Sequence, residues 1–460
     1  MAHFDLLIIG TGSGNSILTE DFDSMRVAIV EKGAFGGTCL NVGCIPSKMF
    51  VYAADVAHLA QHAGPALGVH TRFDGADWPA IRDRVFGRID PIAEGGERYR
   101  AEEQEHVTVY KGVATFVGDK RISVAMNDGG TETVTADRIV LAAGARVTIP
   151  DVVADSGVPY YTSDTIMRID ALPDRLIVLG GGYIGAELGN VFGSLGSSVT
   201  IINRGDTMIR REDPEIASRF TDSYAERFDV RLNTVINEIS RRDDGAIVVG
   251  ATEDGVPVTI TGDAVLVATG RTPNGDILNV EATGVRLDDH GYVITDENLR
   301  TDNPDIWALG DLTNPAQLKH TANADARVVS HNLLNPDNLR AIDRSLTPHA
   351  IFGHPQVAAV GLTEPEAVAA GHSIVTTVHP FGSAAYGWAM EDTTSACKLV
   401  ADADTRMLLG AHIIGPQAST LIQQLIQGMT FGQTVDEMAR GQLYIHPALT
   451  EVVEQALLNL

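Results

Sequence analysis

The sequence predicts an α/β protein with two similar nucleotide-binding units and a separate C-terminal α+β domain. An apolar strand runs into a glycine-rich turn twice, over residues 5–10 and again over residues 176–180, and a second strand follows each turn. Each copy is followed later by an apolar strand that ends in small residues, at 139–144 and at 264–270. Two strand–turn–helix–strand units of this kind are typical of Rossmann-like dinucleotide-binding domains and indicate two bound dinucleotides.

The 460 residues exceed what one hydrophobic core usually organises, so two to four domains are expected. Residues 76–105 are predicted as a polar helical stretch that is broken by Pro91 and by the glycine pair 95–96. A β-rich segment follows over 107–134, and the C-terminal part changes to mixed strands with an apolar helix at 419–430. The predicted domains are 1–146 (first nucleotide domain, first part), 147–266 (second nucleotide domain), 267–339 (first nucleotide domain, second part) and 340–460 (C-terminal domain).

The composition is that of an acidic globular protein, with 44% hydrophobic residues and a formal net charge of −26. Such a charge repels nucleic acid and anionic membrane surfaces. No apolar stretch reaches the ~18 residues of a membrane span, and no basic segment of a secretory signal precedes the first strand. Three cysteines are too few for a secreted disulfide framework. We therefore expect a cytoplasmic protein.

The first glycine turn predicts a pyrophosphate site. Gly10 permits the tight turn, and Gly12 lets backbone amides approach a phosphate at the N-terminus of a helix. The usual third glycine is replaced by Asn15, although Gly14 lies beside it. Glu31 ends the next strand 21 residues after Gly10, where a carboxylate binds a ribose diol. Together these residues favour nucleotide binding over an ordinary strand–helix connection.

The second turn is a complete G-x-G-x-x-G pattern, whose glycines are Gly180, Gly182 and Gly185. The strand that follows it ends at Asn203, where an NAD-selective site usually has an acidic residue. Arg204 and Arg210 lie just beyond, and guanidinium groups can hold a 2′-phosphate through charge-assisted hydrogen bonds. The sequence therefore favours NADPH over NADH, the alternative being two solvated surface arginines.

Cys39 and Cys44 lie in the most specific stretch of the chain, GGTCLNVGCIPSK. Residues five apart on a regular helix are separated by a rise of about 7.5 Å, too far for a disulfide. Gly43 and Pro46 make a regular helix less favourable here, and a strained, accessible disulfide is easily reduced. The alternatives are a metal pair, although zinc sites favour shorter spacings, or two buried thiols. Cys397 is interpreted as a packed small side chain.

Further motifs follow in order: ATGRTPN at 268–274, ALGD at 308–311, and His446-Pro447 with Glu451. Together with the two turns and the cysteine pair they resemble, over the full length, the pyridine-nucleotide disulfide oxidoreductases, the family of glutathione reductase and dihydrolipoamide dehydrogenase. The resemblance implies FAD at the first turn, NADPH or NADH at the second, and a homodimer whose interface is formed by the C-terminal domain.

The resemblance also implies residue roles at the two nucleotide sites. Asp311 matches the residue that holds the flavin ribityl chain, and Tyr183 matches the gate over the nicotinamide pocket. The expected FAD-binding residues are Gly10, Gly12, Gly14, Glu31, Thr38, Lys48, Gly144 and Asp311. The expected NADPH-binding residues are Gly180, Gly182, Tyr183, Gly185, Arg204, Arg210 and Gly270.

For catalysis, the resemblance implies a thiol next to the flavin, Cys44, and a thiol that attacks the substrate, Cys39. His446 matches the acid–base that the other subunit contributes, with Glu451 orienting it. Lys48 and Glu187 match an ion pair beside the flavin ring. An isolated histidine near a C-terminus is usually structural, but the carboxylate five residues beyond His446 favours the catalytic interpretation.

Four stretches resemble the branch of the family that acts on mycothione, a disulfide of an acetyl-cysteinyl amino-sugar–inositol conjugate. They are residues 12–18, 85–93, 385–392 and 438–442. The predicted helix after the first turn carries acidic residues where glutathione reductase has basic ones, namely Glu20, Asp21 and Asp23. Mycothione lacks the carboxylates that basic residues would bind, so it is the expected substrate.

Three alternatives stay open at this point. A dihydrolipoamide dehydrogenase would use NAD, which the Asn203-Arg204 pair disfavours, and a glutathione reductase would meet an anionic peptide with the acidic segment described above. A non-enzymatic flavoprotein scaffold would have no need for both cysteines together with His446 and Glu451. The expected enzyme is therefore an NADPH-dependent flavoprotein disulfide reductase.

Overall fold

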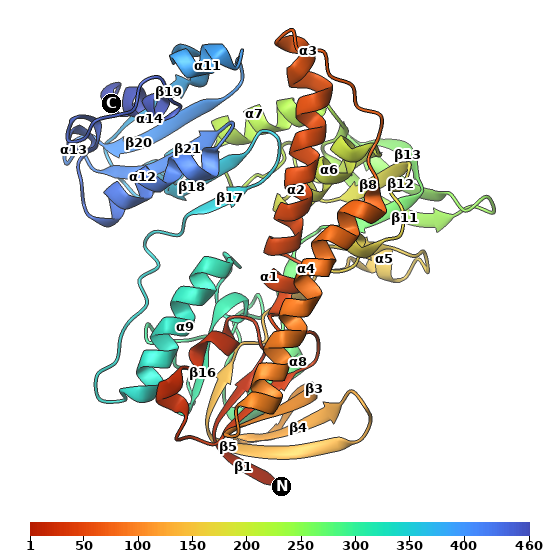
Figure 1. Ribbon diagram of the computed structural model, residues 1–460, viewed down its shortest axis with the longest axis vertical. Helices are drawn as coiled ribbons and strands as arrows, with labels where there is room; N and C mark the ends of the chain where they lie inside the picture. The colour runs from red at the N-terminus through yellow and green to blue at the C-terminus, as the bar shows by residue number, and fades with distance from the viewer. The chain divides into compact units, whose positions relative to one another are not determined.

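The computed structural model describes all 460 residues, which form two compact units (Figure 1). Unit 1 consists of residues 1–47, 82–148 and 270–344, and unit 2 consists of residues 48–81, 149–269 and 345–460. Each unit is assembled from three separated stretches of chain, so contacts between distant segments build both cores. No helix of the protein combines the length and the apolar character needed to cross a membrane.

A six-stranded sheet forms the centre of unit 1. Its strands are β1 (Ala2–Ile9), β2 (Val27–Glu31), β3 (Val107–Gly118), β4 (Arg121–Met126), β5 (Thr131–Leu141) and β16 (Ile306–Ala308). The parallel part has the order β3–β2–β1–β5–β16, and Leu6 of β1 lies opposite Val27 on one side and Arg138 on the other. β4 pairs antiparallel with β3 and β5, which confirms the β-rich segment predicted over 107–134.

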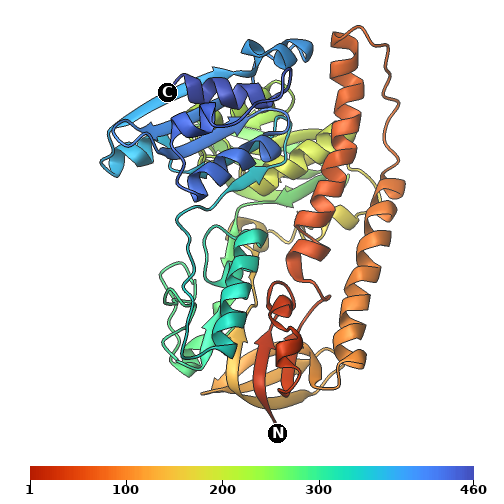
Figure 2. The same ribbon diagram turned by 60° about the vertical axis from the view of Figure 1, so that its left-hand side comes forward.

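Both faces of this sheet are covered. Figure 2 shows α9 (Lys319–Leu334) along one face, where Leu6 and Ile8 of β1 are buried together with Val329 and Leu333 of α9. The alternate residues of β1 belong to a second buried cluster on the opposite face. The shorter elements are α1 (Gly37–Asn41), β6 (Ala145–Val147), β15 (Arg271–Pro273), α8 (Gly275–Leu278), η6 (Val280–Thr283) and η7 (Gly310–Leu312).

The long helix α4 (Trp78–Arg98) is continuous, so the predicted break at Pro91 and the glycine pair 95–96 is wrong. Proline removes one backbone donor and crowds the carbonyl four residues earlier, which usually kinks or ends a helix. Here Val85, Ile89 and Ala93 form a buried stripe with a spacing of four residues, on both sides of the proline. Burial of this stripe outweighs the loss of one hydrogen bond.

Unit 2 contains the second glycine turn in a five-stranded parallel sheet. Its strands are β7 (Tyr161–Thr162), β8 (Arg175–Leu179), β9 (Ser198–Ile202), β10 (Asp229–Arg231) and β14 (Ala264–Val267). The order β10–β9–β8–β14–β7 repeats the order around β1. An antiparallel sheet of β11 (Thr234–Arg241), β12 (Ile247–Glu253) and β13 (Val256–Gly262) is inserted before β14. The internal duplication predicted from the sequence is therefore confirmed.

Five helices of unit 2 precede the strands of this sheet in the sequence or lie between them. They are α2 (Cys44–His58), which begins in unit 1, then α3 (Gly64–Ala66), α5 (Asp151–Ala154), α6 (Tyr183–Leu195) and α7 (Pro214–Ala225). α6 follows the second glycine turn directly, and most of its residues are buried. This helix is the one that the strand–turn–helix–strand pattern predicts.

The C-terminal part of unit 2 forms an antiparallel sheet of order β17–β18–β21–β20–β19. The strands are β17 (His349–Ile351), β18 (Val357–Gly361), β19 (Ile374–Pro380), β20 (Ala396–Asp402) and β21 (Leu408–Ile414). The helices are α10 (Glu364–Ala369), α11 (Ala385–Ala389), α12 (Ala418–Thr430), α13 (Val435–Arg440) and α14 (Thr450–Leu458). The predicted apolar helix at 419–430 is confirmed as α12, which packs with α13 and α14 against β18, β20 and β21. Cys397 lies in this core, fully buried, as predicted.

The helix expected after the first glycine turn is absent. Two 3₁₀ turns take its place, η1 (Gly14–Ile17) and η2 (Glu20–Phe22). At the second turn, a Cβ atom on Gly185 would lie 2.0 Å from the carbonyl oxygen of Gly180, so this helix packs closely only because the third glycine is present. Asn15 has a side chain at the equivalent position, which excludes the same packing. The acidic residues near Glu20 therefore lie on a short surface turn and not on a helix.

Candidate active site

The first candidate nucleotide site lies at the end of β1 in unit 1. Gly10, Gly12 and Gly14 form the turn that leaves this strand. The carboxylate of Glu31, at the end of β2, accepts hydrogen bonds from the amide and hydroxyl of Thr11, at 2.8 Å and 2.7 Å. Its other oxygen accepts from the amide of residue 33 at 2.7 Å. The carboxylate is thus fixed beside the turn, as binding of a ribose diol requires.

A second carboxylate of unit 1, Asp311 in η7, is partly buried. Burial raises the pKa of Asp311, and the positive charges of Arg271 and Lys319 oppose this only in part. A partly buried carboxylate of this kind favours hydroxyl donors, such as those of a ribityl chain. Gly144 follows β5 with a φ of 63°, and Thr38 is exposed on α1. These donors and acceptors fit a flavin dinucleotide.

Sequence reasoning missed Lys319, the first residue of α9. Its ammonium donates to the hydroxyl of Ser13 in the first turn at 2.8 Å, and that hydroxyl donates to Asn323 at 3.1 Å. Its charge also acts on Asp311 and Cys39, lowering the pKa of both against the larger effect of burial or hydrogen bonding. No motif spacing marks this lysine, because residues more than 300 positions away bring it to the turn.

The two cysteines lie on different helices. α1 ends at Asn41 and α2 begins at Cys44, so the predicted departure from a regular helix is confirmed. Between them, a Cβ atom on Gly43 would lie 2.9 Å from the carbonyl oxygen of Thr38 and 3.3 Å from the Cα of Cys39. Only glycine lets the chain return so closely on itself. The break therefore places Cys44 against Cys39.

Cys39 and Cys44 are present as thiols joined by a side-chain hydrogen bond. This hydrogen bond raises the pKa of the Cys39 thiol, and burial and the charge of an ionised Cys44 raise it further. Cys44 is the more exposed of the two. The Cys39 thiol therefore holds its proton strongly beside Cys44. Two thiols that share a hydrogen bond can join as a disulfide when two electrons and two protons leave them.

In unit 2, Lys48 and Glu187 form a bidentate ion pair. The lysine ammonium lies 2.9 Å and 2.7 Å from the two oxygens of Glu187, which is nearly buried at the side of α6. The amide of Phe352 donates to the same carboxylate at 2.9 Å, and the ammonium lies 4.8 Å from the centre of the Phe352 ring. The charge of Lys48 is thus held by an acid and an aromatic face.

His446 and Glu451 form a second polar pair in unit 2. The imidazole Nδ1 lies 2.7 Å from a carboxylate oxygen of Glu451, whose other oxygen accepts from the amide of Ala448. The hydrogen bond from His446 lowers the pKa of Glu451. The His446 side chain is 73% exposed in the single chain. A carboxylate thus orients the ring and leaves its other nitrogen at the surface, the arrangement of a general acid–base.

The second glycine turn lies between β8 and α6, with Gly182 as the residue before the helix and Tyr183 as its first residue. Gly270 lies three residues after the end of β14 and belongs to unit 1. The Tyr183 hydroxyl donates to the buried carboxylate of Glu212, which also accepts from Nε2 of His349 at 2.8 Å. The His349 ring stacks on Tyr183 at 5.6 Å. The sequence analysis missed Glu212 and His349, because neither belongs to a motif.

The side chain of Asn203 stabilises the loop at this site. Its amide nitrogen donates to the carbonyls of Gly205 and Thr207 at 3.0 Å and 2.8 Å, which shapes the loop after β9. Arg204 and Arg210 leave this loop as exposed side chains, and neither forms an ion pair. Two unpaired guanidinium groups beside a dinucleotide turn fit a 2′-phosphate better than a diol.

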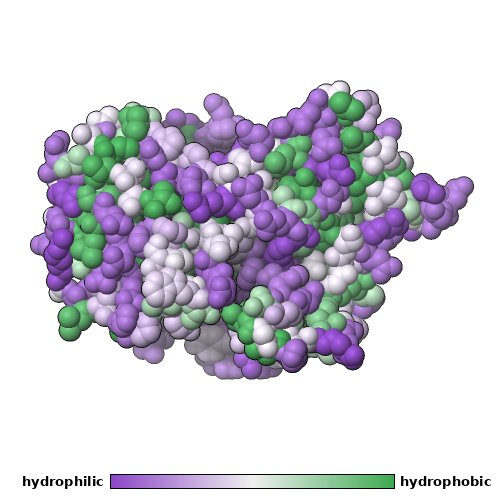
Figure 3. All heavy atoms as spheres, turned by 90° about the horizontal axis from the view of Figure 1, so that it is seen from above, coloured by the Kyte–Doolittle hydropathy of each residue, from purple (hydrophilic) through white to green (hydrophobic).

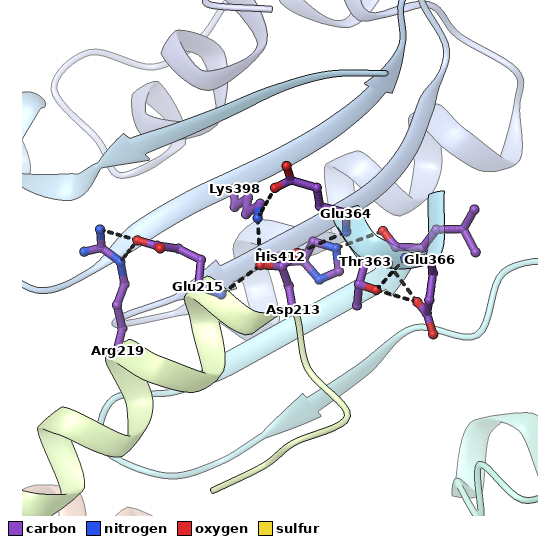
Figure 4. A network of polar contacts seen from close by, with 9 residues as sticks. Asp213, Glu215, Arg219, Thr363, Glu364, Glu366, Lys398 and His412 are labelled. Atoms are coloured by element: carbon purple, nitrogen blue, oxygen red, sulfur yellow. Dashed lines mark hydrogen bonds and ion pairs between the residues drawn. The ribbon is translucent and has the colours of Figure 1, made fainter. Parts of the chain in front are cut away.

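A buried network fixes the far end of that loop (Figure 4). Asp213 caps α7 by accepting from the amide of Glu215 at 3.1 Å, and it also accepts from the ammonium of Lys398 at 2.8 Å. Lys398 belongs to β20 and pairs with Glu364 at 2.6 Å. A buried lysine between two carboxylates therefore ties the nucleotide loop to the C-terminal sheet, within unit 2.

Comparison with known proteins gives matches over the whole chain. Residues 4–326 match the family described as pyridine nucleotide-disulphide oxidoreductase, and residues 347–457 match its dimerisation domain. Mycothione reductase of Mycobacterium tuberculosis is 48% identical and covers 100% of both chains. Dihydrolipoyl dehydrogenase of Haloferax volcanii is 33% identical, covering 99% of this chain and 96% of its own.

A solved structure is also similar to this chain. The HOCl-induced flavoprotein disulfide reductase RclA of Escherichia coli matches with a TM-score of 0.83 at 27% identity, covering 98% of this chain and 99% of its own. These matches extend over nearly the full length of each relative, and the solved structure shares the fold.

Proposed function

The chain belongs to the pyridine nucleotide-disulphide oxidoreductase family, and from this premise we propose that it reduces mycothione to two molecules of mycothiol. At the coarser level it is a flavoprotein disulfide reductase with FAD and NADPH as cofactors. The observation that carries the finer proposal is the 48% identity over the full length to mycothione reductase. Identity to the dihydrolipoyl dehydrogenase is lower, at 33%.

We assign FAD to unit 1 and NADPH to unit 2. The fixed carboxylate of Glu31, the partly buried Asp311 and the cysteine pair all belong to unit 1. The unpaired Arg204 and Arg210 belong to unit 2 and supply positive charge for a 2′-phosphate. The predicted residues that lie in the same unit as their cofactor, such as Thr38 for FAD and Tyr183 for NADPH, are proposed to line it.

FAD held by Glu31 and Asp311 would supply the two electrons, taken from NADPH, that reduce the Cys39–Cys44 disulfide. Cleavage of the Cys39–Cys44 bond with one proton leaves Cys44 as the thiolate and Cys39 as the thiol. The raised pKa of Cys39 supports this order, because the hydrogen bond and the charge of Cys44 keep the Cys39 proton in place. Cys44 is thereby proposed to be the thiol beside the flavin.

The second half of the reaction is proposed to use Cys39 and an imidazole. His446 of the partner subunit accepts the Cys39 proton, and the Cys39 sulfur attacks one sulfur of mycothione. The imidazolium, which Glu451 stabilises, then protonates the departing mycothiol. The Cys44 thiolate attacks the mixed disulfide, re-forms the Cys39–Cys44 bond and releases the second mycothiol, which takes a proton from solvent.

The proposed homodimer rests on the surface near His446. Leu443 is 100% exposed and Ile445 is 74% exposed in the single chain, and Phe431 is 75% exposed. Figure 3 shows hydrophobic side chains gathered in patches between hydrophilic ones when the protein is seen from above. Exposed apolar residues of this size mark interaction sites. We propose that a dimer covers these residues and that His446 of one subunit acts at the cysteine pair of the other.

The choice of mycothione rests on charge as well as on identity. Glu20, Asp21 and Asp23 are all exposed on and beside η2. Their position on a short turn changes the geometry predicted from the sequence but keeps three negative charges at the surface. A disulfide without carboxylates meets no repulsion there, whereas glutathione disulfide carries several carboxylates.

The experiment compares specificity constants of the purified holoenzyme for mycothione, glutathione disulfide and lipoamide, each with NADPH and with NADH. We expect mycothione with NADPH to give the highest kcat/KM. A preference for glutathione disulfide would overturn the mycothione assignment and leave the disulfide reductase intact. A preference for lipoamide with NADH would instead favour a dihydrolipoamide dehydrogenase.

A further inference from the structure

Arg100 is a buried cation that the proposed mechanism does not use. It lies in the π-helical turn η4 (Tyr99–Glu103) after α4 and is 7% exposed. Its Nε donates to the side-chain oxygen of Asn15 at 2.8 Å, and Nη2 donates to the carbonyls of Asn15 and Leu18 at 3.0 Å and 3.3 Å. Nη1 donates to Gln104. Each of these acceptors is uncharged, so the guanidinium charge is held without a hydrogen-bonded carboxylate.

The residues that Arg100 contacts form the part of the first turn where a helix is missing. At the second turn, α6 supplies 13 residues whose aligned peptide dipoles favour an anion at the N-terminus. At the first turn, η1 has four residues and supplies no comparable dipole. Asn15 stands at the third-glycine position, and Arg100 holds both its side chain and its carbonyl. Arg100 therefore supports this segment and adds a buried positive charge beside the third-glycine position.

We propose that Arg100 is a positioning residue for the flavin dinucleotide, which holds the first glycine turn in shape and supplies the positive charge that the absent helix would provide. The segment from Asn15 to Leu18 cannot close onto the sheet as a helix, so its carbonyls need donors other than its own amides. Arg100 provides these donors from one rigid guanidinium plane. The inference rests on the assignment of FAD to the first turn.

Burial is consistent with this role. It lowers the pKa of Arg100, while the neighbouring Tyr99 and Asp23 oppose the shift, so burial of this cation costs folding free energy. A bound diphosphate would offset that cost, because the attraction between an anion and a buried cation is stronger than at the surface. Binding of the dinucleotide should accordingly depend on Arg100 more strongly than folding of the unliganded chain does.

The test measures the dissociation constant of FAD for the full-length apoprotein, by titration of FAD fluorescence, in wild type, Arg100→Met, Arg100→Lys and Asn15→Ala. We expect Arg100→Met to weaken FAD binding at least tenfold. Arg100→Lys keeps the positive charge but not the planar set of guanidinium donors, so its FAD affinity should fall less. Asn15→Ala removes one acceptor, so its FAD affinity should fall the least. In Arg100→Met, added KCl should weaken FAD binding less steeply than in wild type, because one cation near the phosphates is gone.

The matched control is Arg138→Met. Arg138 also belongs to unit 1 and pairs with Leu6 within the β1–β5 ladder, but its guanidinium donates to the carbonyl of Leu333 and to the sulfur of Met25 and not to the first turn. The Arg138→Met variant should bind FAD with an affinity within twofold of wild type. NADP⁺ affinity, measured by calorimetry, should stay unchanged in all four variants, because the second turn lies in unit 2.

Two outcomes would overturn the inference. One is wild-type FAD affinity in a folded Arg100→Met or, if that variant does not fold, in both Arg100→Lys and Asn15→Ala. The other is simple addition of the losses of Asn15→Ala and Arg100→Met in the double variant, since a clamp that acts through Asn15 predicts little further loss. A wild-type protein that does not bind FAD at all would instead refute the cofactor assignment on which the inference rests.

Discussion

The two glycine turns of this protein begin from the same strand plan and continue differently. Residues 10–26 join β1 to β2 and residues 180–197 join β8 to β9, so the two connections are nearly equal in length. The second contains the 13-residue helix α6, whereas the first contains only the 3₁₀ turns η1 and η2. The difference coincides with one position, Asn15 in the first turn and Gly185 in the second. A single side chain at a close contact can thus decide whether a helix packs on a strand.

The largest effect is expected where that contact is closest. Gly185→Ala places a methyl group 2.0 Å from the Gly180 carbonyl, so α6 must move away from β8. We expect a loss of about 2–3 kcal/mol in unfolding free energy, measured as a lower urea midpoint. Gly182→Ala is the control, because no atom lies within 4 Å of its Cβ position. Equal midpoints for both variants would break the comparison between the two turns.

The two nucleotide sites differ in charge, because two arginines follow β9 at the second site. Arg204→Ala with Arg210→Ala removes two unpaired guanidinium groups from the second site, where the first site has the carboxylate of Glu31. We expect the KM for NADPH to rise by roughly 10- to 150-fold, the cost of a charge-assisted contact of about 1.5–3 kcal/mol. The KM for NADH should change little. Similar increases for both coenzymes would show that the pair does not bind the 2′-phosphate.

A fall in pH should lower the stability of unit 2 more than that of unit 1. In unit 2 the rings of His58 and His354 lie 3.7 Å apart, and burial, with neighbouring positive groups that include Arg227, lowers their pKa values to about 3 and about 4. The unfolded chain takes up these protons below about pH 6.5, so the stability of the neutral pair is complete above that pH and is lost as the pH falls toward 4.

We expect the amide protection factors at pH 5, corrected for the intrinsic exchange rate at that pH, to fall in β8 and β9 more than in β1 and β2, with a loss of about 1–2 kcal/mol in unit 2. The His58→Gln variant has one titrating ring fewer and should show a flatter dependence on pH. Unchanged pH dependence in that variant would show that the histidine pair does not cause the acid sensitivity of unit 2.

The smallest effect concerns the residue that follows the second glycine of each turn. This residue is Ser13 in the first turn and Tyr183 in the second, and each is held by partners from distant segments. Tyr183→Phe removes one donor to the buried Glu212 and leaves His349 as the other. A loss of about 1 kcal/mol in unfolding free energy is expected, measured as a lower urea midpoint. An unchanged midpoint would show that the Tyr183 hydroxyl contributes no net stability.

Much of the architecture follows from local sequence. The strands β1, β2, β8, β9 and β14 are short apolar runs next to glycine turns, and the break between the cysteines follows from the glycine at 43. These features depend on residues that are close in the sequence. The consequence of Asn15 was not predictable in the same way, because it depends on how closely a helix must approach the strand behind it.

The missed residues share one property. Arg100, Lys319, Glu212 and His349 act through partners that lie between 29 and more than 300 positions away. Each is a single polar residue outside any recognisable spacing, so no pattern in the sequence marks it. The continuity of α4 at Pro91 was missed for a related reason. Burial of its apolar stripe is a tertiary effect, and it prevails over the local preference of proline.

The central claim is that Cys44 receives electrons from the flavin and Cys39 passes them to the substrate disulfide. The most direct measurement is the absorption spectrum of Cys39→Ser and Cys44→Ser during anaerobic reduction. The account predicts that Cys39→Ser retains Cys44 as a thiolate beside the flavin, with a long-wavelength charge-transfer band and no turnover of mycothione. Cys44→Ser should lack the band. A band in Cys44→Ser and none in Cys39→Ser would contradict the assignment of the two thiols.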